Sequence, residues 1–122
     1  MVTRGSSWKR LTITVRQVGD VSILDLSGPL GIGEPREIFR NQIDDLLTAG
    51  TKQFAINMTN VPFVDSTGIG ALVGAHTTIE AAGGSCRIFG VQPQVFNVLK
   101  IVHVDQVLSL TATEEAALSG FQ

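Results

Sequence analysis

The segment FVDSTGIGALVG, residues 63–74, carries the residue types and the spacing best suited to chemistry. Asp65, Ser66 and Thr67 follow an apolar strand pattern and precede a helical one, and residues of these types favour the start of a helix. The first backbone N–H groups of a helix have no partner within it, and its dipole favours negative charge there. A phosphate on a serine at this place would therefore meet ready donors.

Gly68 and Gly70 follow at once and leave the start of the helix without bulky side chains. A partner's backbone or active site could approach closely at such positions. Each glycine inside a helix costs about 1 kcal/mol relative to alanine, so a pair of them needs a reason. Tight packing on a sheet is the alternative explanation, and Asp65 and Ser66 would also serve as ordinary caps.

Other kinds of site find no support in the sequence. It contains no Gly-Lys-Ser/Thr step of a phosphate-binding loop and no G-x-S-x-G around Ser66. Two lone histidines, His76 and His103, do not suggest a metal centre. The single cysteine, Cys86, excludes a disulfide within the chain and is expected in the core. We therefore expect no catalytic residue, no metal and no cofactor.

Composition narrows the class of partner. Nine basic and eleven acidic residues give a net charge of −2 without a basic patch, which argues against nucleic-acid binding. No apolar stretch approaches the roughly 20 residues that span a bilayer, and the first residues do not resemble a signal peptide. We expect a cytoplasmic protein with one domain over residues 9–122, preceded by a frayed arm or expression remnant over residues 1–8.

Hydrophobic periodicity predicts the strands. Alternation over residues 11–18 and an apolar pattern over 21–26, separated by Gly19-Asp20, predict a hairpin. Apolar runs at 54–58 and 86–91 predict buried strands, and residues 107–110 a last short one.

The helices are predicted near Pro35, from Thr67 to Ala82, from Pro93, and over residues 113–119. Val98 and Val102 belong to the apolar stripe of the third helix, and Thr111 with Glu114 has capping-box spacing for the last. Strands that alternate with helices imply an α/β fold, with a mixed, mostly parallel sheet of four or five strands and about four helices packed on it.

VPFVDSTGIGALVG, followed by EAAGGSCRIFGVQPQVFNVLKIVHVDQVL, resembles the STAS domain of anti-sigma factor antagonists. The resemblance covers nearly the whole chain, from about Leu11 to Leu118. It implies a bacterial regulator of transcription that works by partner switching. In such proteins the serine directly after the aspartate, here Ser66, is phosphorylated by an anti-sigma factor that is also a serine kinase.

The resemblance further implies that the unphosphorylated antagonist binds the anti-sigma factor and that the phosphorylated form releases it. A PP2C-type phosphatase resets the switch. The domain would catalyse nothing and would be a monomer or a weak homodimer.

The partner is expected to contact the start of the second helix together with the loop after the second strand. If the strands before these two segments are parallel neighbours, both segments emerge at one edge of the sheet. The loop departs from the acidic turn typical of the family, and its apolar side chains would either be exposed for the partner or lie beneath the first helix. The predicted partner-binding residues are Asp65, Ser66, Thr67, Gly68, Ile69, Gly70, Leu30 and Ile32.

Two other functions remain open. The chain could be a non-catalytic STAS subunit of a larger assembly, such as a stressosome-like scaffold or a transporter accessory. It could also be a small hydrolase that uses Ser66, which would require His76 or His103 to lie beside that serine.

Overall fold

The computed structural model describes residues 10–31 and 33–121, so the predicted arm over residues 1–8 lies outside the described residues. The elements within these ranges follow one another in the order β1 (Thr12–Val18), β2 (Val21–Ser27), α1 (Glu34–Thr48), β3 (Gln53–Asn60), α2 (Ser66–Ala81), β4 (Ser85–Phe89), α3 (Pro93–Ile101), the 3₁₀ helix η2 (Val104–Gln106), β5 (Leu110–Thr111) and α4 (Glu114–Ser119).

The strands form one sheet in the order β1-β2-β3-β4-β5. β1 and β2 pair antiparallel as the predicted hairpin, and each later pair is parallel. Each parallel connection passes through helical structure, as crossover geometry requires. The predicted α/β architecture with a mixed, mostly parallel sheet is confirmed.

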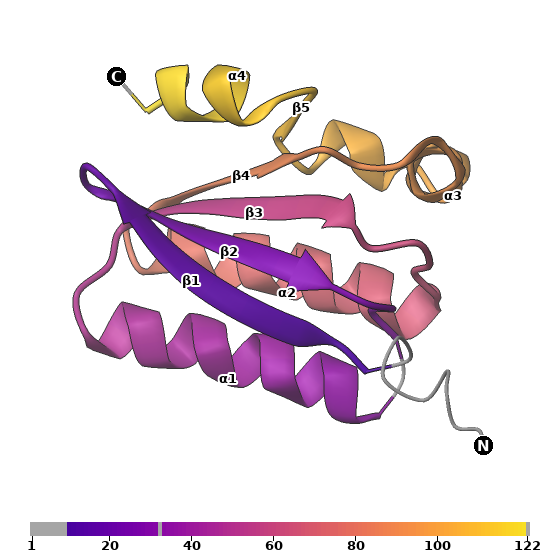
Figure 1. Ribbon diagram of the computed structural model, residues 1–122, viewed down its shortest axis with the longest axis horizontal. Helices are drawn as coiled ribbons and strands as arrows, with labels where there is room; N and C mark the ends of the chain where they lie inside the picture. Colours follow the sequence, from indigo (N-terminus) through magenta and orange to yellow (C-terminus); the bar gives the residue numbers. More distant parts are fainter. Residues whose placement is uncertain (1–9, 32, 122) are drawn as a thin grey trace.

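The two faces of the sheet are covered by different helices (Figure 1). α1 and α2 lie side by side beneath the sheet, whereas α4 lies over the opposite face. β2 shows the division directly, because Leu24 and Leu26 join the larger core and Val21 and Ile23 join the smaller core with Ala117 of α4. Burial on both faces explains why the apolar residues of β2 do not simply alternate with polar ones.

The helix starts predicted from the sequence agree with the observed ones to within a residue or two. α2 begins one residue earlier than predicted, and Cys86 is buried in the core as expected. The predicted cap of the last helix is wrong: Thr113, not Thr111, accepts a hydrogen bond from the Ala116 N–H, at 3.1 Å. Thr111 instead belongs to β5, which starts at Leu110, so the strand predicted over residues 107–110 was placed too early.

α3 contributes less to the core than its apolar stripe suggested. Val95 and Leu99 are buried, but Val98 and Val102 are exposed, so only part of the apolar stripe joins the core. α3 lies at the end of β4, where it can bury only a narrow stripe (Figure 1). Its remaining apolar side chains are left at the surface.

Candidate functional site

The start of α2 is fixed by Asp65. Its backbone is extended (φ −98°, ψ −175°), and its Oδ1 accepts a hydrogen bond from the Gly68 N–H at 2.8 Å. This is N-cap geometry, in which a side-chain oxygen satisfies a backbone donor of the first turn. Asp65 is therefore the cap, and Ser66 is the first helical residue.

Ser66 is exposed, whereas its neighbour Thr67 is half-buried. The first turn of α2 contains no acidic residue, so the Asp65 carboxylate at the N-cap is the acidic group that offsets the positive end of the helix dipole. The helix dipole would stabilise the negative charge of a phosphate on Ser66. Because Ser66 is exposed, another protein can reach it.

The loop after β2 lies directly beside this helix start. The Leu30 N–H donates to the Phe63 carbonyl oxygen at 3.0 Å, and the Gly28 N–H donates to that of Asn60 at 2.9 Å. Leu30 and Val64 form a parallel bridge. Since β2 and β3 are parallel neighbours, the predicted meeting of the two segments at one sheet edge is confirmed.

Leu30 itself is fully buried, so the expectation that it is exposed for a partner is wrong. The bridge to Val64 turns its side chain into the larger core. The alternative, in which it lies beneath the first helix, agrees with its place in the same core as Phe39 and Ile43 of α1. The second apolar residue predicted in this loop, Ile32, lies outside the described residues.

Two more of the predicted partner-binding residues are buried. Ile69 is buried in the core, and Gly68 is buried because its α-carbon faces the Leu30 carbonyl group, leaving no room for a β-carbon. Gly70 is exposed and meets no such neighbour. Of the predicted partner-binding residues, Ser66 and Gly70 are therefore exposed, and Asp65 and Thr67 are half-buried.

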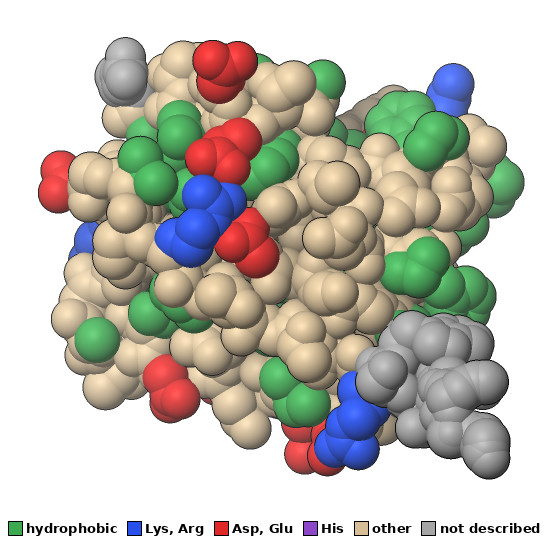
Figure 2. Space-filling model, viewed as in Figure 1, with side chains coloured by type: hydrophobic (Ala, Val, Ile, Leu, Met, Phe, Trp, Pro, Cys, Tyr) green, Lys and Arg blue, Asp and Glu red, His purple; other side chains and the backbone are tan. Residues whose placement is uncertain are grey.

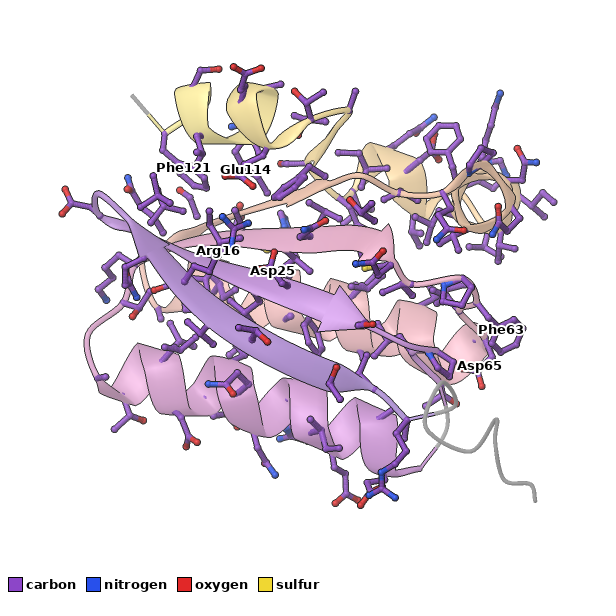
Figure 3. All side chains as sticks on the ribbon, viewed as in Figure 1. Arg16, Asp25, Phe63, Asp65, Glu114 and Phe121 are labelled. Carbon is purple, nitrogen blue, oxygen red and sulfur yellow. The ribbon has the colours of Figure 1, made fainter. Side chains whose placement is uncertain are left out.

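The sequence reading missed an exposed apolar surface next to Ser66. Phe63 is 56% exposed and Ile101, at the end of α3, is 74% exposed. Figure 3 shows Phe63 pointing outward beside Asp65, and Figure 2 shows apolar side chains gathered over α3 and the β3–α2 loop. We name four of these residues the apolar strip: Phe63, Val98, Ile101 and Val102.

Two glutamines hold α3 against the loop that carries Phe63. The Gln94 side chain donates to the Pro62 carbonyl oxygen at 3.3 Å, and the Gln92 side chain donates to that of Thr59 at 2.8 Å. Val98 and Ile101 follow Gln94 at helical spacing, so the strip starts beside the loop and continues along α3. The sequence of α3 could have predicted this exposed surface, because so short a helix contains more apolar residues than one buried stripe can hold.

An ion-pair network lies on the opposite face of the sheet (Figure 3). Arg16 bonds to Asp25 at 2.5 and 3.0 Å and to Glu114 of α4 at 2.8 Å, and Asn57 donates to Asp25 at 2.8 Å. The hydrogen bonds from Arg16 are the main cause that lowers the pKa of Asp25, although partial burial opposes them. The network joins the hairpin to α4, so its role is structural.

The candidate nucleophiles and bases do not assemble into a catalytic group. Burial is the main cause that raises the pKa of Cys86 to about 12, which keeps it a neutral thiol. His76 lies 3.5 Å from Glu80, and within residues 10–31 and 33–121 neither histidine hydrogen-bonds to Ser66.

The same ranges contain no cluster of three or more His, Cys, Asp or Glu side chains that could hold a metal ion. Nor is any helix in the described part of the chain long and apolar enough to cross a membrane.

Comparison with known proteins gives a consistent assignment. The STAS domain family model matches residues 12–117. The anti-sigma F factor antagonist of Paenibacillus polymyxa is 26% identical over 113 residues, covering 92% of this chain and 96% of that protein. The RsbT co-antagonist protein RsbRA of Bacillus subtilis (strain 168) is 20% identical over 103 residues, covering 84% of this chain but 37% of that protein.

A solved structure shares the fold. The anti-sigma factor antagonist SpoIIAA in its unphosphorylated form superposes with a TM-score of 0.75 at 23% identity, covering 90% of this chain and 96% of that one. The phosphorylated form of this Bacillus cell fate determinant gives a TM-score of 0.69 at 22% identity, covering 91% and 100%. The chain therefore belongs to the STAS domain family, and its homologues include anti-sigma factor antagonists.

Proposed function

We propose that this chain is an anti-sigma factor antagonist that switches partners through Ser66. When Ser66 is unphosphorylated, the chain binds an anti-sigma factor with serine kinase activity. When that kinase phosphorylates Ser66, the complex separates. The observation that carries the proposal is an exposed serine at the first position of α2, three residues after Phe63 of the apolar strip.

The apolar strip supports the binding half of the proposal. Exposed apolar side chains that cluster on one surface are typical of the centre of a protein interface. Phe63 lies in the same loop as the Asp65 cap, so a partner that covers it also meets Ser66 (Figure 3).

Phosphate chemistry supports the release half. A phosphoserine adds about −1.5 to −2 charge at neutral pH. The N-terminus of α2 tolerates this charge, so the fold of the antagonist survives. A partner surface that fits a neutral hydroxyl would meet repulsion and a desolvation penalty, and a change of about 3 kcal/mol weakens binding about 150-fold.

The relatives agree with this function. The Paenibacillus relative is named an anti-sigma F factor antagonist, and SpoIIAA has been solved in both unphosphorylated and phosphorylated forms. By analogy, a PP2C-type phosphatase would restore the unphosphorylated chain, and the cycle would regulate transcription in the cytoplasm. The chain itself has no catalytic role in this scheme.

Phosphate mapping tests the proposal. The chain is incubated with its cognate serine-kinase anti-sigma factor and ATP, and the modified residue is identified by mass spectrometry. We expect phosphate on Ser66, because Ser66 is exposed whereas Thr67 is half-buried. Thr67→Val should accept phosphate normally and Ser66→Ala should not. Phosphate found mainly on Thr67 or elsewhere would reject the assignment.

A second candidate function is that of a non-catalytic subunit in a larger assembly. It is favoured by the match to RsbRA, in which the matching region is only 37% of the protein. A native mass far above 13.0 kDa, combined with no affinity for a kinase-type anti-sigma factor, would select this function instead.

A further inference from the structure

A groove of about 490 Å³ separates α1 from α2 on the outer side of the helical layer. It begins at Thr67, next to Ser66, and continues along α2 to Thr78. Figure 1 shows the two helices lying side by side beneath the sheet. Thr67 and Gly70, at one end of this groove, are also predicted partner contacts, and the rest of the lining has no role in the partner-switching function proposed above.

Two glycines contribute to the α2 wall of the groove, which also contains Thr67, Ala71, Ala75 and Thr78. Gly70 and Gly74 are exposed and one turn apart, and a β-carbon added to either would meet no atom within 4 Å. The chain's own packing therefore does not require glycine there, in contrast to Gly68. Since glycine destabilises a helix relative to alanine, the two glycines lower the stability of α2 without any benefit to the packing of the fold. The benefit is an open wall that a bound molecule can approach closely.

The floor of the groove is apolar and its outer rim is cationic. Phe39 and Ile43 of α1 are buried at its base, whereas Arg36 and Arg40 lie one turn apart on the rim. Asp44 is the acidic residue among the lining side chains, at 3.9 Å from Arg40. The lining therefore carries a net positive charge above an apolar surface.

The ends of the helices also act on one end of the groove, where Asp65 at the N-cap of α2 and Glu34 and Glu37 in α1 offset part of the helix dipoles. The helices follow the parallel strands β2 and β3, so their N-termini lie at the same edge of the sheet. Their dipoles favour an anion at that end of the groove. The acidic residues in the first turn of α1, Glu34 and Glu37, do not line it.

We propose that this groove binds a soluble anionic amphiphile: a small molecule with an apolar body and a carboxylate, sulfonate or phosphate group. The apolar body would lie against Gly70, Ala71 and Gly74 of α2, with the buried Phe39 and Ile43 beneath it. Arg36 and Arg40 would bind the anionic group by paired N–H donors. The volume favours a small molecule, because such sites measure about 300–1,000 Å³. A three-turn helix with its side chains occupies about 1,250 Å³ and would remain mostly outside.

The test uses 8-anilinonaphthalene-1-sulfonate, which joins an apolar ring system to one sulfonate. The full chain is titrated and the dye fluorescence is recorded. We expect saturable binding at a single site, weakened about tenfold or more in Arg36→Gln/Arg40→Gln and abolished by Gly74→Leu. Dodecanoate should displace the dye about tenfold more effectively than dodecanol, which lacks the charge.

Matched controls keep the outcome interpretable. Thr77→Leu adds the same side chain to α2 outside the groove, and Arg10→Gln removes an exposed arginine that pairs with Glu34 instead. Both should bind the dye as the wild type does, and circular dichroism should show that every variant is folded.

Four results of the dye titrations would overturn the proposal. They are no saturable binding by the wild type, unchanged binding in folded Gly74→Leu, equal displacement by dodecanol, and loss of binding in Ile101→Lys, which would place the dye on the apolar strip. Co-sedimentation with phosphatidylglycerol vesicles that depends on Arg36 and Arg40, without displacement by dodecanoate, would assign the arginines to a membrane surface and also overturn it.

Discussion

The carbonyl oxygen of Leu30 lies where a β-carbon on Gly68 would have to stand. The first turn of α2 therefore packs directly on the loop that follows β2. The loop is held in turn by the bridge between Leu30 and Val64. Ser66 takes its position from these contacts, because Ser66 and Thr67 are the two residues between the Asp65 cap and the Gly68 contact.

This contact makes two neighbouring glycines respond in opposite ways to the same substitution. Gly68→Ala should lower the free energy of unfolding by about 1–3 kcal/mol, the usual cost of overpacking. Gly70→Ala should raise it by about 1 kcal/mol, because its β-carbon meets open space and alanine favours the helix. Urea unfolding of both variants measures the difference. Equal effects would show that Leu30 does not restrict the start of α2.

The Arg16–Asp25 pair predicts a pH dependence of stability. The folded pKa of Asp25 lies below its ordinary value of 3.8, chiefly because of the hydrogen bonds from Arg16. The pair therefore contributes stability above the unfolded pKa and loses it as the pH falls through the folded pKa. Between about pH 4 and about pH 2, the free energy of unfolding should fall less steeply in Asp25→Asn than in the wild type.

Urea unfolding at a series of pH values checks this expectation. Asp20→Asn, at the exposed hairpin turn, is the matched control and should keep the wild-type slope. An unchanged slope in Asp25→Asn would mean that the pair does not stabilise the fold.

The apolar strip predicts where a charge disrupts binding without unfolding the chain. Ile101→Lys should weaken binding of the cognate anti-sigma factor about tenfold or more, because a lysine would be desolvated in the interface. Ile101 is 74% exposed, so the melting temperature should change little. Val18→Lys, at the other end of the sheet, is the control and should bind normally. Equal affinities would remove α3 from the interface.

Much of this architecture was predictable from the sequence because local periodicity decides it. The alternation in β1 and the Gly19-Asp20 turn specify the hairpin, and Pro35 and Pro93 mark helix starts that the structure confirms. The helix start at Ser66 was predictable for the same reason, since small polar residues there are followed by a helical pattern.

The errors concern properties that local patterns do not contain. Leu30 resembled an exposed loop residue until the parallel bridge to Val64 placed it in the core. Val98 matched a core stripe, but α3 lies at the end of the sheet and buries only a narrow face. Thr111 and Thr113 both have cap chemistry, and the pairing of β5 with β4 decides between them. Each outcome depends on contacts between segments far apart in the sequence.

The affinity of Ser66 variants for the cognate anti-sigma factor tests the central claim most directly. Isothermal titration calorimetry would compare the wild type, Ser66→Ala and Ser66→Asp, with circular dichroism to verify that each is folded. Because Asp65 provides the cap, neither substitution should unfold α2. The account predicts that Ser66→Ala binds within about threefold of the wild type and that Ser66→Asp binds about tenfold or more weakly. Equal affinity of folded Ser66→Asp and Ser66→Ala would contradict a switch operated by charge at Ser66.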